Sequence, residues 1–141
     1  MKSKFTKALL LIMVFSLCLP IFESTVEARA SQYIDSYDAY ISRNGSGNLT
    51  IWFDVASTGK MDKLGASSVF LYEKNNGLWV LVKTYYNTDY TTMLRTNSGI
   101  HSSSLSYSGT TGKQYYANVY IWAEKGGSGD SRSKVTTTVS A

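Results

Sequence analysis

The residues that could form a hydrolytic active site lie at 101–104, where the only histidine of the chain, His101, precedes three serines. A serine nucleophile, a histidine base and a carboxylate are the components of a catalytic triad. No serine stands in the G-x-S-x-G pattern that presents a nucleophile on a sharp turn. We therefore interpret His101 as a solvated or half-buried strand residue and predict no catalytic residues.

Paired carboxylates are a second possible source of chemistry, because a glycosidase needs only two of them at a set separation. Acidic residues are scattered after position 30, and no local spacing selects a pair. A non-enzymatic protein is the prediction, and a small secreted hydrolase is an alternative. The acidic residues are Asp35, Asp38, Asp54, Asp62, Glu73, Asp89, Glu124 and Asp130.

Metal ligands are sparse in this sequence. The only cysteine is Cys18, and one histidine cannot supply an ordinary structural zinc site. Calcium needs six to eight oxygen ligands, to which residues 35–38 or the glycine-rich stretch ending at Asp130 could contribute, but neither follows the EF-hand spacing. We predict no metal and no cofactor, and a weak calcium site stays open.

The strongest candidate for binding is a set of aromatic residues on two strand-like stretches, 69–82 and 114–123. If these are neighbours in one sheet, Val69, Leu71, Ala117, Val119 and Ile121 face the core. The predicted ligand-binding residues on the outer face are Phe70, Tyr72, Trp79, Tyr120 and Trp122, bordered by Arg132 and Lys134 from the last strand. Such rings could stack on sugars or anchor a protein partner. Alternatively, they only stabilise the sheet as cross-strand pairs.

A hairpin must position the first part of this set. Asn76 and Gly77 stand between two apolar runs, which is among the strongest hairpin signals. A two-residue turn, or a four-residue loop over 74–77, places one alternate set of side chains on the core face. That set is Val69, Leu71, Val80 and Val82.

Further strands are predicted at 33–42, 49–56, 100–107, 114–123 and 131–139. The clearest alternation is in 49–56, where Leu49, Ile51, Phe53 and Val55 share a face. Residues 58–65 are expected to form a loop from which Met61 and Leu64 turn inward, and 124–130 a mobile loop. Segment 85–97 is either a short edge strand or a loop.

These strands predict an all-β protein, an antiparallel two-sheet sandwich of about seven to eight strands. Residues 105–123 resemble the entry to the sixth strand of immunoglobulin-like and fibronectin type III-like domains. This resemblance implies that Tyr115 occupies a tyrosine corner, with its hydroxyl group bonded to the backbone across the turn. A small barrel or a jelly roll is the alternative.

The first 30 residues have the pattern of a secretory signal peptide. Lys2, Lys4 and Lys7 precede an apolar run at 8–19, and Ala28-Arg29-Ala30 provides a small-x-small cleavage site after Ala30. The run is shorter than the roughly 20 residues of a membrane span. We therefore expect a secreted, extracellular protein with one domain at 31–141 and no membrane association after cleavage.

Charge argues against nucleic acid as a partner. The net charge is +4 for the whole chain, but after position 30 there are 10 basic and 8 acidic residues. The basic residues are scattered singly, whereas nucleic-acid binding favours a clustered patch. Because Cys18 leaves with the signal peptide, stability has to come from a packed core.

The region 31–141 also resembles a family of small secreted proteins of Gram-positive bacteria without assigned function. The resemblance is carried by Gly47-Asn48-Leu49-Thr50-Ile51, Met61 with Gly65-Ala66, Tyr72-Glu73, Gly77 with Trp79-Val80, and residues 115–119. It implies export and a sandwich, and it adds no active site.

The function predicted from the sequence is therefore a secreted, non-catalytic binding module for cell-wall glycan or an extracellular protein. An alternative is a self-associating structural protein of the cell envelope, in which the aromatic face packs against another copy. The sequence leaves the ligand and the oligomeric state open.

Overall fold

One long strand, β2 (Asn48–Asn75), pairs with four others and determines the arrangement of the chain. The computed structural model describes residues 31–141, so the predicted signal peptide lies outside the described residues. The remaining strands are β1 (Ile34–Arg43), β3 (Leu78–Tyr86), β4 (Leu94–Ser108), β5 (Gln114–Lys125), β6 (Ser128–Val135) and β7 (Val139–Ser140). A short 3-10 helix, η2 (Thr91–Met93), precedes β4.

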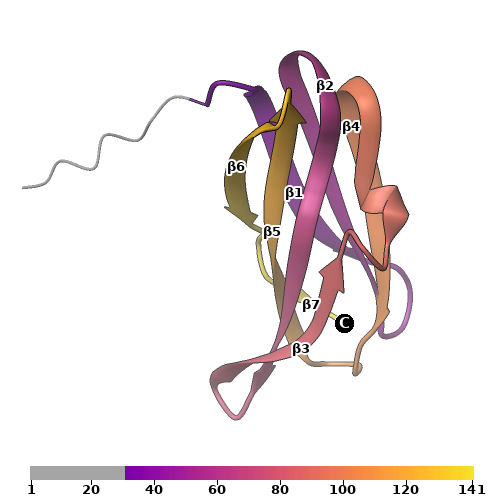
Figure 1. Cartoon of the computed structure of the whole chain (residues 1–141). Helices are drawn as coiled ribbons and strands as arrows, with labels where there is room; N and C mark the ends of the chain where they lie inside the picture. Colours follow the sequence, from indigo (N-terminus) through magenta and orange to yellow (C-terminus); the bar gives the residue numbers. More distant parts are fainter. Residues whose placement is uncertain (1–30) are drawn as a thin grey trace, which may run out of the picture.

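β2 changes partners along its length. Its first half pairs with β1 and β4, and its second half pairs with β5 and β3. β6 and β7 then add to β5, so all seven strands belong to one antiparallel sheet, which curls over itself (Figure 1). The predicted all-β, antiparallel fold is confirmed, and the curled sheet is consistent with a sandwich or a small barrel.

The core lies inside the curl and is formed by the apolar members of the alternating patterns. Apolar side chains at every second position of a strand point to the same side, which explains why each pattern buries one face. The predicted core residues Leu49, Ile51, Phe53 and Val55 are all buried, as are Val69, Leu71, Ala117, Val119 and Ile121. Met61 and Leu64 also turn inward, as predicted.

The expected loop at 58–65 is wrong, because β2 continues through it. Met61 and Lys63 pair with Ser98 and Thr96 of β4, and Lys63 also pairs with Glu124 of β5. The register shifts on both sides of this stretch, between Ala56 and Met61 and between Ala66 and Ser68. These irregularities interrupt the period of two on which the sequence interpretation depended.

The hairpin of β2 and β3 has the predicted two-residue turn. Asn76 and Gly77 have φ angles of 48° and 84°, as the left-handed conformation of a type I′ turn requires. The prediction that Val80 belongs to the core is wrong, because its side chain is 46% exposed. Val80 pairs with Glu73, the last residue of β2 that pairs with β5, and so lies at the border of the core. Beyond it the turn end of the hairpin extends past the neighbouring strands (Figure 1).

Segment 85–97 contains the end of β3, a turn, η2 and the start of β4. The predicted mobile loop at 124–130 is instead a tight turn at Gly126 and Gly127, whose φ angles are 58° and 79°. Within residues 31–141, no helix is long and apolar enough to cross a membrane.

Candidate binding face

The outer surface of β3, β2 and β5 carries seven aromatic side chains, which we call the aromatic face. Residues that pair directly across antiparallel strands point to the same side of the sheet. Tyr72 pairs with Tyr116, and both point to the outer side of the sheet. Their neighbours Leu71 and Ala117 pair with each other, point to the core side and are fully buried. The aromatic face consists of Phe70, Tyr72, Trp79, Tyr86, Tyr116, Tyr120 and Trp122.

Three of these rings form a first cluster around Phe70. Its centroid lies 5.6 Å from that of Tyr120 and 6.4 Å from that of Tyr86, with interplanar angles of 83° and 87°. Edge-to-face contacts at these distances are the preferred geometry of aromatic pairs. Phe70 therefore supports one ring from β5 and one from β3.

A second cluster forms around Tyr116. The ring of Tyr72 stacks on it with 4.9 Å between centroids and 10° between planes, and Trp79 meets it edge to face at 4.7 Å. The Nζ atom of Lys74 lies 5.7 Å from the Trp79 ring centroid, within the range of a cation–π contact. The two clusters are neighbours along β2, because Phe70 and Tyr72 are two residues apart on this strand.

The rings of the aromatic face differ in how much surface they offer. Trp79 and Tyr120 are each 38% exposed, and Tyr86 is also exposed. Phe70, Tyr72, Tyr116 and Trp122 are half-buried. The half-buried rings thus hold the exposed rings in place, so that a partner could contact a surface of fixed shape.

Trp122 is held against the backbone of β6. A Cβ atom on Gly129 would lie 1.9 Å from Cη2 of Trp122 and 2.2 Å from Cζ2. The indole ring therefore occupies the space of the missing side chain and covers the backbone there. Only a glycine permits this approach.

Arg132 and Lys134 do not border the aromatic face, contrary to the sequence prediction. They pair with Ile121 and Val119, whose side chains are buried, and so share the core side of the sheet. Lys134 Nζ lies 3.1 Å from Asp38 of β1, and Arg132 lies 3.4 Å from Asp130. Lys134 therefore bridges β6 and β1, whereas Arg132 pairs with a residue of its own strand. Their place on the aromatic face is taken by Ser131 and Ser133, which pair with Trp122 and Tyr120.

The sequence interpretation missed two members of the face, Tyr86 and Tyr116. Tyr116 lies on the same alternate set of β5 as Tyr120 and Trp122, so its spacing already placed it on this side. Tyr86 is reached only through a register shift near Val82, because Leu71 pairs with Lys83 whereas Tyr72 pairs with Leu81. No alternation in the sequence marks this irregularity.

A smaller aromatic pair lies on the other half of the sheet. Tyr40 of β1 and Trp52 of β2 pair across the strands, and their rings stack at 6.2 Å with 15° between planes. Both side chains are exposed. This pair lacks a supporting cluster of the kind seen around Phe70 and Tyr116 among residues 31–141.

His101 is a half-buried residue of β4, as predicted. It pairs with Val55 and contacts the ring of Phe53, while Ser102 and Ser104 pair with Asp54 and Trp52 on the opposite side. Its Nε2 atom lies 2.9 Å from the carbonyl oxygen of Thr92. The histidine thus has a structural contact with the 3-10 helix, and two of the three serines point away from it.

Two of the carboxylates considered for calcium, Asp38 and Asp130, are engaged with protein groups. A hydrogen bond from Lys134 and one from the amide of Ala39 lower the pKa of Asp38. Partial burial raises the pKa of Asp130, but hydrogen bonds from Ser31 and the amides of Tyr33 and Gln32, with the charge of Arg132, outweigh it and lower the pKa overall. Residues 31–141 contain no group of three His, Cys, Asp or Glu side chains that could hold a metal ion.

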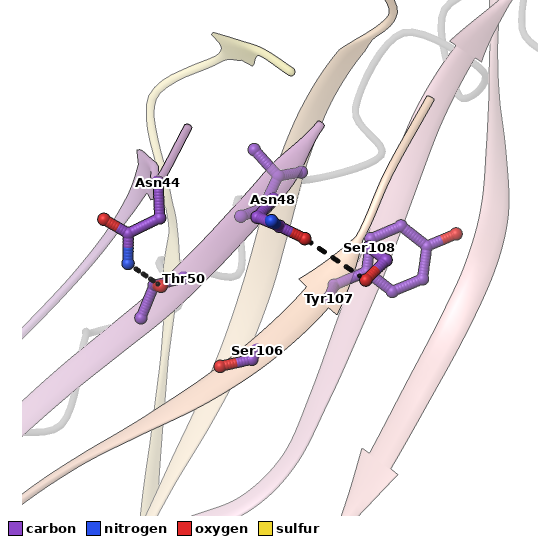
Figure 2. A pocket seen from close by; sticks show the side chains of 7 residues that line it. Asn44, Asn48, Thr50, Ser106, Tyr107 and Ser108 are labelled. Atoms are coloured by element: carbon purple, nitrogen blue, oxygen red, sulfur yellow. Dashed lines mark hydrogen bonds between the residues drawn. The ribbon is translucent and has the colours of Figure 1, made fainter. Parts of the chain in front are cut away.

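Two hollows lie away from the aromatic face. The first, of about 480 Å³, is lined by Asn44, Asn48, Leu49, Thr50 and residues 106–108 (Figure 2). Its polar groups bind one another: Asn44 Nδ2 donates to Thr50 Oγ1 at 3.0 Å, and Ser108 Oγ donates to Asn48 Oδ1 at 3.3 Å. The hollow is therefore a polar surface depression without a charged or reactive group.

The second hollow, of about 560 Å³, lies between β3 and β4, which do not pair with each other. Tyr85, Tyr90 and Tyr107 line it, and the hydroxyl group of Tyr85 donates a hydrogen bond of 2.9 Å to the carbonyl oxygen of Ser106. Burial, together with the neighbouring Tyr90 and Tyr107, raises the pKa of Tyr85 to about 12. Tyr85 thus links β3 to β4 where backbone pairing is missing.

Comparison with known proteins adds no family assignment. No protein-family model matches the chain, and no curated protein matches it significantly.

Proposed function

We propose that the protein is an exported, non-catalytic binding module that uses the aromatic face. The observation that carries the proposal is the set of seven aromatic rings on one side of β3, β2 and β5, in which Trp79 and Tyr120 retain exposed surface over half-buried rings. Tyrosine and tryptophan bury a large area at low entropic cost, and they dominate binding surfaces for that reason.

The charge of the face favours a neutral ligand. Lys74 lies over the ring of Trp79, and Lys63 and Glu124, on the same side of the sheet as Trp122, form an ion pair without net charge. The uncharged polar residues of this side include Asn118, Ser131 and Ser133. Flat rings between amide and hydroxyl groups suit a polysaccharide, whose sugars combine apolar faces with hydroxyl groups. A cell-wall glycan is therefore the first candidate for the ligand, and an extracellular protein is the second.

Export is part of the same proposal. Residues 1–30 would serve as a signal peptide cleaved after Ala30, which would deliver residues 31–141 to the cell surface or the medium. Mass measurement of the protein recovered from a secreting host tests this directly. A product that starts at a residue other than Ser31 would require another cleavage site.

The experiment that tests binding compares two double variants. Purified protein is incubated with a glycan array and with cell-wall fractions, beside Trp79→Ala/Tyr120→Ala and beside Tyr40→Ala/Trp52→Ala. The second variant removes an exposed aromatic pair of similar size from the other half of the sheet. We expect binding to fall about tenfold or more only in the first variant, since truncating a central aromatic anchor typically costs more than 1 kcal/mol.

The outcomes distinguish the alternatives. Equal loss in both variants, or loss in neither, would exclude the aromatic face as the site. A hydrolytic activity that survives Trp79→Ala/Tyr120→Ala and is abolished by Asp or Glu substitutions would establish an enzyme instead.

A further inference from the structure

The first half of β3 is an edge strand with one free side. β3 pairs with β2 alone, and no other strand among residues 31–141 pairs with it. An unpaired strand edge presents a row of backbone N–H and C=O groups that can accept another strand. Proteins usually block such edges with charges, bulges or covering segments.

Residues 78–81 have none of these protections. They read Leu-Trp-Val-Leu, and Leu78, Val80 and Leu81 are 72%, 46% and 48% exposed. The register shift lies beyond them, near Val82, and the first charge on the strand is Lys83. Leu78 and Trp79 pair with residues of β2 beyond its last pair with β5, at the hairpin end that extends past the neighbouring strands, so a second chain can approach it (Figure 1).

We propose that this edge pairs with the same edge of a second copy of the protein, strand β3 against strand β3 in antiparallel orientation. A two-fold axis at Val80 places all five apolar residues from Leu78 to Val82 opposite one another. In this register Leu78 faces Val82 of the other copy, and Trp79 faces Leu81. Lys83 faces Gly77, so the two lysines lie at opposite ends.

Other registers are less favourable. A shift of the axis to Trp79 places Leu81 and Val82 opposite the turn residues 77 and 76, and a shift to Leu81 places Leu78 and Trp79 opposite the polar residues 84 and 83. Apolar and aromatic cross-strand pairs each contribute a few tenths to about 1 kcal/mol, so the register centred on Val80 gains the most. The pairing would also join two aromatic faces into one continuous surface.

A second copy fits this hairpin better than a lipid bilayer does. Asn76 stands exposed at its turn, and Asn75 Oδ1 accepts a hydrogen bond from Lys113 Nζ, so insertion into hydrocarbon would take two amide groups and a charged lysine out of water. Strand pairing leaves the turn in water and satisfies the edge of β3. The proposal does not depend on ligand binding by the aromatic face, because Val80 points to the other side of the sheet from Trp79.

Cross-linking tests the register. Protein purified after expression of the whole chain carries Cys18→Ser together with either Val80→Cys or Ile100→Cys. Both positions are exposed, and Ile100 lies on β4. Directly opposed residues of an antiparallel pair have Cα atoms about 4.5–5.5 Å apart, within the range of a disulfide. We expect Val80→Cys to form a reducible dimer at least about tenfold faster than Ile100→Cys.

Sedimentation equilibrium over a concentration series tests the interaction itself. Val80→Lys places two like charges opposite each other at the axis and should weaken self-association about tenfold or more. Unchanged melting and circular dichroism of this variant establish that the monomer still folds. A wild-type monomer at all concentrations, or equal cross-linking at positions 80 and 100, would overturn the proposal. The proposal would also be wrong if Tyr120→Ala abolished self-association while Val80→Lys kept it. It would be wrong as well if the protein did not self-associate but bound lipid vesicles and lost that binding in Val80→Lys.

Discussion

The hydroxyl group of Tyr115 donates a hydrogen bond of 2.5 Å to Oε2 of Glu73, its partner across β5 and β2. The hydroxyl oxygen of Tyr115 also accepts a hydrogen bond of 2.8 Å from the backbone amide of Thr110, on the far side of the turn between β4 and β5. Tyr115 is fully buried, and its ring lies against Gly109. This geometry confirms the tyrosine corner that the sequence resemblance implied.

Tyr115→Phe should destabilise the protein by about 1–3 kcal/mol, because it leaves the Glu73 carboxylate and the Thr110 amide without their partner. Urea denaturation of the two proteins measures the difference. Tyr40→Phe removes a hydroxyl group from an exposed ring and should change stability by less than about 0.5 kcal/mol. An equally small effect at position 115 would show that water replaces the lost hydrogen bonds.

Tyr85 should make the protein sensitive to alkaline pH. Its pKa is raised from 10.0 to about 12 in the folded state, so the fold favours the neutral hydroxyl group. The resulting stability is fully present below about pH 10 and is lost as the pH rises through about 12. Burial and the hydrogen bond to Glu73 also raise the pKa of Tyr115, so ultraviolet titration of tyrosinate should show late-ionising groups whose number falls by one in Tyr85→Phe. Ionisation of all tyrosines near their ordinary pKa, without unfolding, would contradict this.

Gly129→Ala should disturb the packing of Trp122, since the new methyl group would overlap the indole ring. We expect a loss of about 1–3 kcal/mol, the usual cost of overpacking, and a shift in tryptophan fluorescence. Gly59→Ala is the matched control, because a Cβ atom there meets nothing within 4 Å. Alanine at position 59 should be neutral or stabilise by up to about 1 kcal/mol. Equal melting temperatures for the two variants would refute the close contact of Trp122 with β6.

Val69→Ala and Val80→Ala should differ sharply in stability, although the sequence predicted both residues in the core. Val69 is fully buried, and its truncation should cost about 2 kcal/mol through lost burial and the cavity left behind. Val80 is exposed in the monomer, and its truncation should cost less than about 0.5 kcal/mol at low protein concentration. Thermal unfolding of dilute samples measures both. Similar losses would mean that the hairpin end folds back onto the core.

Local alternation was sufficient to predict the faces of β5 and of the second half of β2. Each of these strands buries small or branched residues on one side, and its aromatic residues lie on the other, except for the buried Tyr115 of β5. The turn at Asn76 and Gly77 was equally predictable, because its left-handed backbone strongly favours these residue types. Most of the aromatic face follows from these two facts.

The all-β class and the core side of the central strands could be predicted from the sequence, because both depend on side chains a few residues apart. The contact of the Tyr115 hydroxyl group with the backbone was implied by the resemblance of residues 105–123 to immunoglobulin-like domains. Three features came from the tertiary structure instead: β2 runs unbroken through 58–65, Tyr86 joins the aromatic face, and Arg132 and Lys134 lie on the core side of β6. These features depend on register shifts and strand pairing, which are set by hydrogen bonds to partners far away in the chain. A period of two carries no information about which residue of a distant strand lies opposite.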